Sequence, residues 1–524
     1  NNIFYNSGSG YAYYLYNYYS SFFTSSDNNC FYTNGSYPVY TSSNQTFSQW
    51  QSYWDSNSIE CDPVFEHDSI FLSRQYLIDG AGIPIAGVSD DYNGNLRPTT
   101  NPDIGVYEFD IPDSDAGIYE IATSSILCDN YLNDESIIVK IKNFGVDTLT
   151  SVFLSHEVNA NIQLAYAWTG NLAQGEVSDD IVIGTYNFSI GSSNTIKAWT
   201  SFPNNNTEGY AYNDTLQTSP THLALNGNYS IGGLNPDFTT ISEAITALNS
   251  GGVCGPVVFN IRQGTYYEDM YFGSITGTSS SNTISFQSES GDYNDVIVSN
   301  FLSSSALVQL NGSDYINFRN MTFEVGSGSN IGKLFSFASN SDNDMLEGNR
   351  FKGSTNGSTS TDNAIMYSSS GENNNIEFHN NIFEDGSYGI YFYGSSSSSY
   401  YCDYMTIKEN SFFNQEYRSI EMKYHNYASI DSNYFETNSI ESYFRFIYMS
   451  YSDYNDIHSN EMLYTGTSSM SSAAGIYLEY CDNSPSIQKN SIIFGQNSGR
   501  YGIYIYYSDY SLVANNLIQV GYNS

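Results

Sequence analysis

The side chains with the most chemical potential stand at alternate positions of five short segments near the end of the chain. Each segment has the form Ile-x-Φ, where Φ is apolar, and the segments begin at Ile390, Ile420, Ile447, Ile476 and Ile503. This alternation is typical of a β-strand with one buried face, so the other residues should point outward. The outward residues are Tyr391, Glu421, Tyr448, Tyr477 and Tyr504, followed by Tyr393, Lys423, Ser450, Glu479 and Tyr506.

Only Glu421, Lys423 and Glu479 carry charge among these outward residues. Polysaccharide lyases and hydrolases built on such strands need clustered acids, or a base with Ca²⁺, on one face. Because no such cluster is visible, the sequence predicts that the chain is not an enzyme. The histidines, such as His379, His425 and His458, form no repeated pair or metal spacing and are expected on the solvated surface.

The outward tyrosines form the more distinctive pattern. We expect Tyr391, Tyr448, Tyr477 and Tyr504 to stack in a row, joined by Tyr424, Tyr451, Tyr480 and Tyr507. Exposed aromatic rows can dock sugar rings or another protein surface. The alternative is that like-over-like stacking only stabilises strand pairing.

The charge balance limits the possible partners. The formal net charge is −39, with 55 acidic and 16 basic residues among 524. Such a surface repels phosphate backbones and anionic lipid heads, which argues against nucleic acid and membrane-surface partners. Ca²⁺ is a possible counterion, although no ligand cluster is visible and acidity also serves solubility. No cofactor is indicated otherwise.

Six cysteines are present: Cys30, Cys61, Cys128, Cys254, Cys402 and Cys481. None forms a CxxC pair, so a structural zinc site is not expected. Cys30 and Cys61 lie in one irregular segment and are the favoured disulfide pair. No stretch is apolar over the length that spans a bilayer, and the sequence opens within a repeat, as expected for part of a longer processed polypeptide.

A motif Φ-x-x-Asn-x-Φ recurs through the last third of the chain. The spacing of its asparagines ranges from 23 residues (Asn410 to Asn433) to 32 residues (Asn349 to Asn381). We expect each asparagine at a bend, bonded to its equivalents above and below and adopting the left-handed backbone of the bend. The full set is Asn349, Asn381, Asn410, Asn433, Asn460, Asn490 and Asn516, with a displaced copy at Asn320.

The two interleaved motifs give at least two short strands in each repeat. Such strands bury their apolar faces only when successive repeats stack, about 4.8 Å apart. The predicted fold is therefore all-β, a right-handed parallel β-helix (solenoid). The chain lacks the Leu-rich consensus of a leucine-rich repeat, which argues against that fold. A propeller blade needs about four strands in ~40–45 residues, which does not fit these shorter repeats.

The pattern resembles the pectate-lyase-type right-handed β-helix family, particularly large secreted surface proteins of the Bacteroidetes type, over about three quarters of the chain. Residues 223–524 resemble the start of such a helix. Ile241, Ala244, Ile245 and Leu248 have helical spacing after Thr239 or Thr240, ending at the pair 251–252. The resemblance implies that this helix caps the first coil.

Residues 1–110 resemble the last coils and closing segment of the same family, with motifs at 61–65, 78–82, 91–97 and 103–108. Residues 111–222 change character. Their short alternating strands, at 137–145, 167–170 and 195–199, resemble an Ig-like β-sandwich module of the CARDB type. The β-helix is thus expected to be split around an Ig-like domain.

This order places a β-helix end before a β-helix beginning. We interpret the chain as a structural subunit, or one repeat unit, of an extracellular bacterial surface filament or adhesin. Copies would join head to tail, either covalently in a tandem array or as separate subunits. A direct junction of Ser524 with Asn1 would bring two Asn-type strands together, so either part of a coil is missing there or the junction is non-covalent. The alternative is a secreted β-helix protein that binds or degrades polysaccharide.

Overall fold

The computed structural model describes residues 1–15, 26–67, 70–73, 75–123, 126–128, 135–188, 193–207, 210–218, 221–300, 306–326, 332–369, 371–396, 401–468, 470, 472–483, 485–495 and 501–521. The chain divides into two compact units. The smaller unit comprises Asn1–Ser125, Asp134–Asn187 and Asn194–Thr221. The larger unit comprises Ile126–Asn133, Phe188–Ser193 and His222–Ser524.

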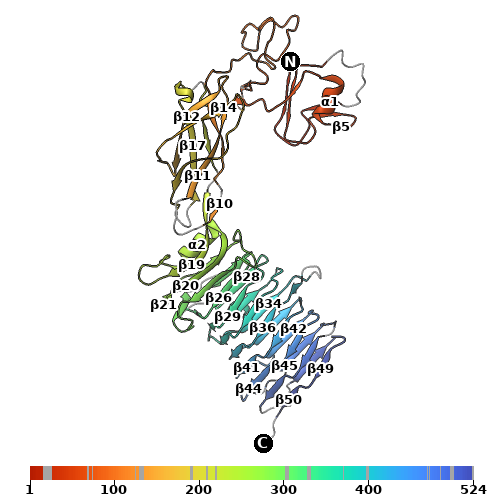
Figure 1. Ribbon diagram of the computed structural model, residues 1–524. Helices are drawn as coiled ribbons and strands as arrows, with labels where there is room; N and C mark the ends of the chain where they lie inside the picture. The colour runs from red at the N-terminus through yellow and green to blue at the C-terminus, as the bar shows by residue number, and fades with distance from the viewer. Residues whose placement is uncertain are drawn as a thin grey trace. The chain divides into compact units, whose positions relative to one another are not determined.

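The larger unit is a parallel β-helix, which confirms the predicted fold class. Figure 1 shows its strands stacked as successive coils. The first sheet runs, in order, β10 (Ile126–Cys128), β19 (Thr221–Ile231), β20 (Val253–Ile261), β23 (Ile284–Ser288), β26 (Ile316–Arg319), β29 (Met345–Glu347), β32 (Glu377–His379), β36 (Thr406–Lys408), β40 (Ser429–Asp431), β43 (Asp456–His458), β46 (Ser486–Gln488) and β49 (Leu512–Ala514).

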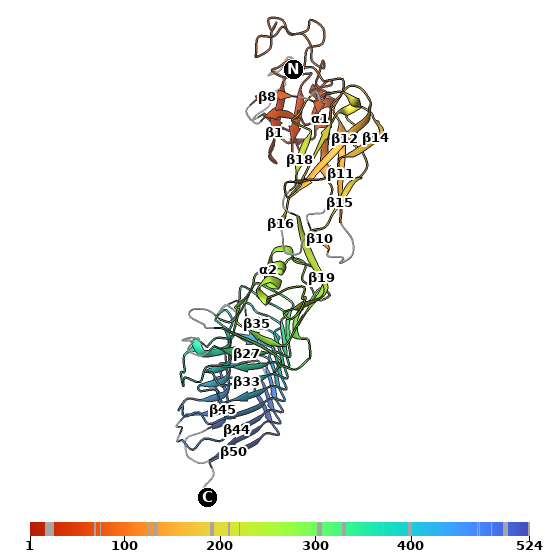
Figure 2. The ribbon, with the colours of Figure 1, turned by 90° about the vertical axis from the view of Figure 1, so that its left-hand side faces the viewer.

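Two further parallel sheets complete each coil, as the turned view in Figure 2 shows. The second sheet runs β21 (Gly264–Tyr266), β24 (Val296–Asn300), β27 (Thr322–Val325), β30 (Arg350–Lys352), β33 (Ile382–Glu384), β37 (Ser411–Phe413), β41 (Tyr434–Thr437), β44 (Glu461–Tyr464), β47 (Ser491–Phe494) and β50 (Leu517–Val520). The third runs β22 (Met270–Phe272), β25 (Val308–Asn311), β28 (Phe335–Ala338), β31 (Ala364–Ser368), β34 (Tyr388–Tyr393), β38 (Arg418–Lys423), β42 (Arg445–Ser450), β45 (Ala474–Glu479) and β48 (Tyr501–Tyr506). A short pair, β35 (Cys402–Asp403) and β39 (His425–Asn426), lies at one corner.

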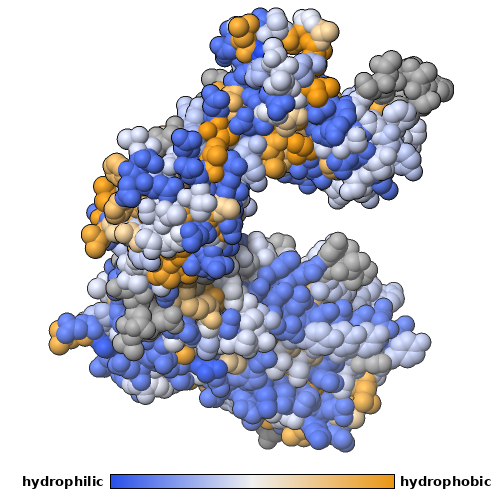
Figure 3. Space-filling model, turned by 45° about the horizontal axis from the view of Figure 1, so that its top comes forward, coloured by the Kyte–Doolittle hydropathy of each residue, from blue (hydrophilic) through white to orange (hydrophobic). Residues whose placement is uncertain are grey.

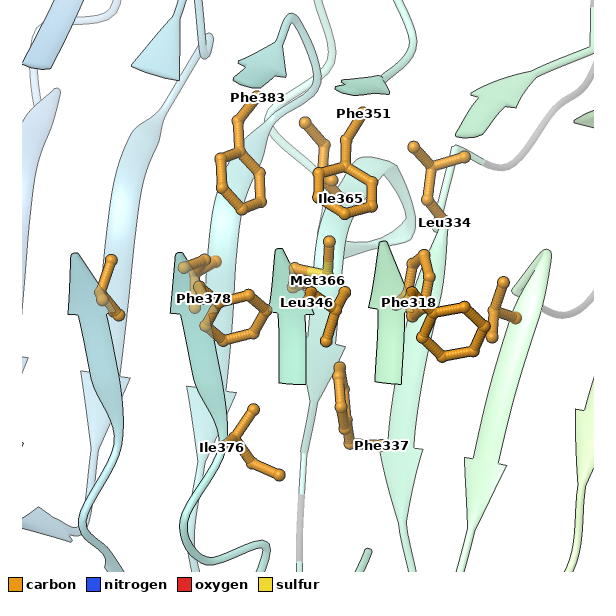
Figure 4. Packing of buried hydrophobic residues seen from close by; sticks show 14 of the residues in the cluster. Phe318, Leu334, Phe337, Leu346, Phe351, Ile365, Met366, Ile376, Phe378 and Phe383 are labelled. Carbon is orange, nitrogen blue, oxygen red and sulfur yellow. The ribbon is translucent and has the colours of Figure 1, made fainter. Parts of the chain in front are cut away.

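The interior is built from rows of equivalent apolar residues. In the second sheet Phe351, Phe383, Phe412 and Phe435 are in register and fully buried. The rings of Phe383 and Phe412 stack at 4.5 Å between centroids. Figure 4 shows Phe351 and Phe383 pointing into the interior, toward which Phe378 also projects. Burial of these rows is what holds successive coils together, because the three strands of a single coil do not cover their own apolar faces.

A helix covers the first coil, where the sequence predicts one. Helix α2 (Ile241–Gly251) buries Ile241, Ala244, Ile245 and Leu248, and contacts β22. Thr240, not Thr239, is the N-cap, and its hydroxyl accepts a hydrogen bond from the backbone N–H of Glu243. The helix therefore shields a strand edge that would otherwise be open to pairing.

The smaller unit also contains coils of parallel strands. β1 (Ile3–Asn6) pairs with β3 (Cys30–Thr33), which pairs with β6 (Ile59–Glu60), and β2 (Tyr13–Leu15) pairs with β4 (Val39–Thr41). The remaining elements of this region are β5 (Asn44–Gln45), α1 (Phe47–Trp54), β7 (Phe65–His67) and β8 (Ile70–Ser73). The Arg97 guanidinium pairs with Glu108 and donates to the carbonyls of residues 103 and 105, which fixes the irregular segment after β8.

The rest of the smaller unit is antiparallel. One sheet has the order β15 (Ile181–Tyr186), β11 (Glu135–Asn143), β9 (Ala116–Ile121). The other contains β13 (Asn161–Ile162), β12 (Leu149–Val158), β17 (Ile196–Ser201) and β18 (Thr215–Gln217), with β14 (Tyr166–Leu172) also paired to β12. Alternate residues of β11 and β17 are buried, as expected for sheets with one covered face.

Candidate functional site

The outward residues of the third sheet lie in two columns. Tyr391, Glu421, Tyr448, Tyr477 and Tyr504 are in register in the first column. Tyr393, Lys423, Ser450, Glu479 and Tyr506 form the second. The structure thus brings these outward residues onto one face of the solenoid.

Stacking along the first column is interrupted. Tyr477 and Tyr504 stack at 4.7 Å, whereas Tyr448 and Tyr477 are tilted by 50°. Tyr391 stacks instead on Tyr367 at 5.5 Å, because Glu421 occupies the next position of the column. The contribution of Tyr367 was missed because its segment lacks the Ile-x-Φ pattern.

Glu421 is buried, although it stands on the outer face of the strand. It is 2% exposed, accepts a hydrogen bond from the Tyr393 hydroxyl at 2.5 Å and forms an ion pair with Arg418. The Arg418 guanidinium lies over the Tyr448 ring, 4.2 Å from its centroid. Burial and the Glu421 carboxylate raise the pKa of Tyr393, so its hydroxyl remains a donor. Arg418 was missed because it precedes the Ile-x-Φ motif.

The other two charged residues also contact tyrosines. Glu479 accepts a hydrogen bond from the Tyr448 hydroxyl at 2.7 Å. The Lys423 ammonium lies over the rings of Tyr424 and Tyr451, at 5.1 and 5.3 Å from their centroids. Cation–π contact of this kind contributes about 0.5–1 kcal/mol where solvent reaches the pair. The charges therefore fix the positions of the surrounding rings.

A row of tyrosine rings follows the corner after the third sheet. Tyr424, Tyr451, Tyr480 and Tyr507 stack in sequence, with centroid distances of 5.3, 4.9 and 5.5 Å. All four have a left-handed backbone, with φ between 44° and 61°. The row places one aromatic ring on each of four successive coils.

A second tyrosine row, not predicted, follows the next corner. Tyr404, Tyr427 and Tyr454 stack at 5.1 and 5.0 Å, again with a left-handed backbone. Tyr510 has the same backbone conformation and is 82% exposed. The recurring sequence Tyr-x-Asp/Asn-Tyr, at 401–404, 424–427, 451–454 and 507–510, is a signal that could have revealed this row.

An acidic row runs between the two tyrosine rows. The Asp453 N–H donates to the Asn426 side chain at 3.1 Å, and the Asp509 N–H donates to Asp482 at 3.3 Å. Asp403 pairs with Asn426 in the β35–β39 ladder. We call the two tyrosine rows and this row the tyrosine–acid strip. Its members are Tyr424, Tyr451, Tyr480 and Tyr507; Tyr404, Tyr427, Tyr454 and Tyr510; and Asp403, Asn426, Asp453, Asp482 and Asp509.

A cavity of about 560 Å³ adjoins the strip. It is lined by Asn340, Glu372, Tyr393, Gly394 and Tyr424, among others. Hydroxyl, amide and carboxylate groups beside an aromatic ring are the groups that hydrogen-bond and stack on a sugar residue.

The recurrent asparagines form a buried ladder at another corner. The Asn410 N–H and side-chain amide both donate to the side-chain oxygen of Asn433, at 2.9 and 3.0 Å. The Asn433 amide donates to the Ile407 carbonyl at 2.8 Å and to Asn460 at 3.0 Å. The same arrangement repeats through Asn349, Asn381, Asn410, Asn433, Asn460, Asn490 and Asn516.

The left-handed residue at this corner differs from the expectation. It is the residue before each ladder asparagine, such as Asn380, Glu409 and Ser432, and φ at these positions lies between 52° and 66°. The ladder asparagine itself lies immediately before the next strand and extends its amide inward to bond the neighbouring coils.

His425 corrects a second expectation. Its side chain is completely buried, not solvated, and lies 6.1 Å from the Phe392 ring. Burial lowers its pKa to about 3, so the ring is neutral. His379 and His458 are partly exposed and lie beside Glu377 and Asp431, at 2.9 and 3.0 Å.

The cysteine pairing also differs from the sequence-based expectation. The disulfide joins Cys128 to Cys254, on β10 and β20, which both flank β19. Cys30 and Cys61 are not bonded, although their sulfurs are 3.6 Å apart. The two cysteines are 126 residues apart in the sequence, and the parallel sheet brings them together. The spacing of cysteines in the sequence does not reveal this proximity.

Two further observations concern ions and membranes. Within the described ranges, no group of three or more His, Cys, Asp or Glu side chains is arranged to hold a metal ion. No helix in the described part of the chain has the length and apolar character to cross a lipid bilayer.

Figure 3 shows a mainly hydrophilic face with scattered hydrophobic residues.

Comparison with known proteins finds a family model that is similar to part of the chain. Residues 363–523 match the family described as "Right handed beta helix region", which agrees with the parallel coils. No curated protein matches the chain.

Several solved structures are similar at low identity. PfbA, a surface adhesin of Streptococcus pneumoniae, is 11% identical with a TM-score of 0.34, over 55% of this chain and 84% of that one. A pectin methylesterase from Aspergillus niger is 13% identical with a TM-score of 0.26, over 57% and 92%. The GH136 lacto-N-biosidase from Eubacterium ramulus is 11% identical with a TM-score of 0.33, over 56% and 68%.

The prediction that the chain is not an enzyme is contradicted by these similarities, because β-helix enzymes are among them. Loops and other strands of a solenoid can supply catalytic groups, so counting acids in two columns of one sheet does not exclude catalysis. At these identities the likeness concerns the fold, and it assigns no activity to this chain.

Proposed function

We propose that this chain is part of an extracellular bacterial surface fibre or adhesin, and that the tyrosine–acid strip binds a polysaccharide. The observation that carries the proposal is the pair of exposed tyrosine rows. Tyr427 and Tyr454 are 43% and 47% exposed, and Tyr451 is 38% exposed. Flat rings repeated on successive coils suit a ligand that itself repeats, such as a glycan chain.

The backbone of the second row does not require tyrosine. Left-handed backbone costs roughly 1–2 kcal/mol for ordinary residues and less for asparagine. Asn343, Asn375 and Asn483 have this conformation in other coils, at the corner that precedes the first sheet. Stacking of the rings offsets about 0.5–1.5 kcal/mol of this cost. Tyrosine stands at these positions although asparagine would be less strained there. This supports a functional role for the aromatic ring itself.

The charge of the strip favours neutral or amino-bearing sugars. Asp453, Asp482 and Asp509 have no ion pair with a basic residue in the described part of the chain. A uronic acid polymer would therefore meet a row of like charges that the nearby Lys423 ammonium offsets only in part, whereas an amino sugar would be attracted.

Substitution of two strip tyrosines tests the proposal. In Tyr427→Asn/Tyr454→Asn, we expect binding to insoluble glucan or to chitosan fragments to weaken roughly fivefold for each ring, on the order of 1 kcal/mol. Stability should stay equal or rise, because asparagine relieves the backbone. Tyr267→Asn, which removes a tyrosine that is 71% exposed and outside the strip, is the matched control.

The outcome separates several explanations. Equal binding by the double variant and the wild type would exclude the strip as the site. Release of reducing or unsaturated ends from the bound glycan would show that the chain also cleaves its ligand. Tight binding only to polygalacturonate would contradict the charge argument.

Assembly of copies end to end is a second proposal for the same fibre. It is supported by the coils of the smaller unit, which repeat the ladder of the larger one. The Asn2 N–H and side-chain amide both donate to the Asn29 side chain at 2.9 Å, as Asn410 does to Asn433. Electron microscopy of the purified chain should show end-to-end strings, and single particles at every concentration would contradict assembly.

We also propose that residues 111–222 are an Ig-like module between two β-helical segments, 1–110 and 223–524. The antiparallel sheets that contain β11 and β12 support this division. Limited proteolysis should release a fragment with ends near these boundaries, and cleavage only elsewhere would contradict it.

A further inference from the structure

We propose that Cys30 and Cys61 are a thiol pair that an external disulfide oxidises to a second structural disulfide. Cys30 begins β3, and Cys61 follows β6, the next strand of the same sheet. Their sulfurs are 3.6 Å apart, and the Cys61 N–H donates to the Phe31 carbonyl at 3.2 Å. The two side chains therefore face each other across adjacent, hydrogen-bonded segments.

The distance between the sulfurs is close to that of a bond. A disulfide has a length of about 2.05 Å, so each sulfur needs to move by roughly 0.8 Å. Rotation about the Cα–Cβ bonds supplies such a displacement without moving the strands. The Cys128–Cys254 disulfide in the same chain is of the kind formed in oxidising compartments, where this second pair would also be exposed to oxidant.

The two thiols have different environments, which assigns their roles. Cys30 is completely buried and packs in a core with Ile78, Ile104 and Phe109, whereas Cys61 is partly exposed. The Cys30 thiol donates to the Cys61 carbonyl at 3.3 Å. The hydrogen bond between the two sulfurs lowers the pKa of Cys61, whereas the same hydrogen bond and burial raise the pKa of Cys30. Cys61 is therefore the thiol that meets the oxidant, and Cys30 is the one that resolves the intermediate.

The chemistry is an ordinary thiol–disulfide exchange. The Cys61 thiolate attacks a disulfide R–S–S–R, forming a mixed disulfide and releasing one RS⁻. The Cys30 sulfur then attacks the Cys61 sulfur, the second R–S group leaves, and the proton of Cys30 passes to it. Two thiols are oxidised to one disulfide, and the external disulfide is reduced to two thiols.

Oxidised glutathione is the probe for the full-length chain. After oxidation, the chain is denatured, alkylated, digested without reduction and mapped by mass spectrometry. We expect linked peptides containing Cys30 and Cys61, together with alkylated Cys402 and Cys481. The Cys402→Ser variant is the matched control and should form the same bridge.

Two further variants test the order of the steps. Cys30→Ser should accumulate a glutathione adduct on Cys61, whereas Cys61→Ser should leave Cys30 unmodified in the native chain. Alkylation of both Cys30 and Cys61 after oxidation, with Cys128–Cys254 intact, would overturn the proposal. So would faster adduct formation at Cys30 than at Cys61.

Discussion

Removal of one rung of the asparagine ladder tests how the solenoid is held together. In Asn433→Ala, three buried groups lose their partners: the Asn410 N–H, one N–H of the Asn410 amide and the Ile407 carbonyl. Each unsatisfied buried group costs about 1–3 kcal/mol, so for three groups the local loss should be on the order of 3–9 kcal/mol. The Asn433 backbone N–H keeps its bond to Asn460, so the damage concerns one side of the rung.

Amide hydrogen exchange is the appropriate assay, because a solenoid can open locally and global unfolding need not be two-state. A loss of about 3 kcal/mol accelerates exchange by roughly two powers of ten at the Asn410 amide. Asn294→Ala, an exposed asparagine, is the matched control and should change stability by less than about 0.5 kcal/mol. Exchange at Asn410 that is unchanged in Asn433→Ala would refute the view that the ladder stabilises the coils.

Three further predictions concern two buried titratable groups and the disulfide. His425 has a pKa of about 3 in the fold against the usual 6.5, so its contribution to the free energy of unfolding is complete above pH 6.5 and falls by about 1.4 kcal/mol per pH unit as pH drops. Urea titrations of His425→Met should not show this loss of stability in acid. An identical loss in the variant would contradict the prediction. Asp344 is fully buried and its pKa is strongly raised, so its contribution to the stability of the fold is present below about pH 4 and falls as pH rises. The stability of Asp344→Asn relative to the wild type should therefore be greater at pH 7 than at pH 4. The same relative stability at both pH values would count against this reasoning. Cys254→Ala removes a disulfide that joins residues 126 apart in the sequence. The free energy of unfolding should fall by about 4–5 kcal/mol in the chain-entropy description, as measured by calorimetry. An unchanged melting temperature would exclude a stabilising role for the disulfide.

The parallel coils could be predicted because their information is local and repeated. The apolar positions around Asn381, Asn410 and Asn433 recur at one coil per period, and stacking then follows from burial. The columns that contain Tyr448 and Tyr477 follow from the same register. Period and alternation therefore determine which residues share a face.

Features that depend on neighbours outside the repeat could not be predicted. Glu421 is buried because Arg418 and Tyr393 cover it, and neither contact follows from the spacing of the Ile-x-Φ motif. His425 is interior because the corner β39 turns its side chain inward, where Cys402 stands in the preceding coil. The polarity of a histidine predicts an exposed side chain, whereas the position of His425 at this corner makes it buried.

Oxidative footprinting of tyrosine side chains tests the polysaccharide-binding proposal most directly. The chain is exposed to hydroxyl radicals with and without a neutral glucan, and modification of each tyrosine is measured by mass spectrometry. The proposal predicts that Tyr427, Tyr451 and Tyr454 become protected in the presence of glucan while Tyr267 does not. Equal modification of the strip tyrosines with and without any of the neutral, amino-bearing or acidic glycans would contradict it.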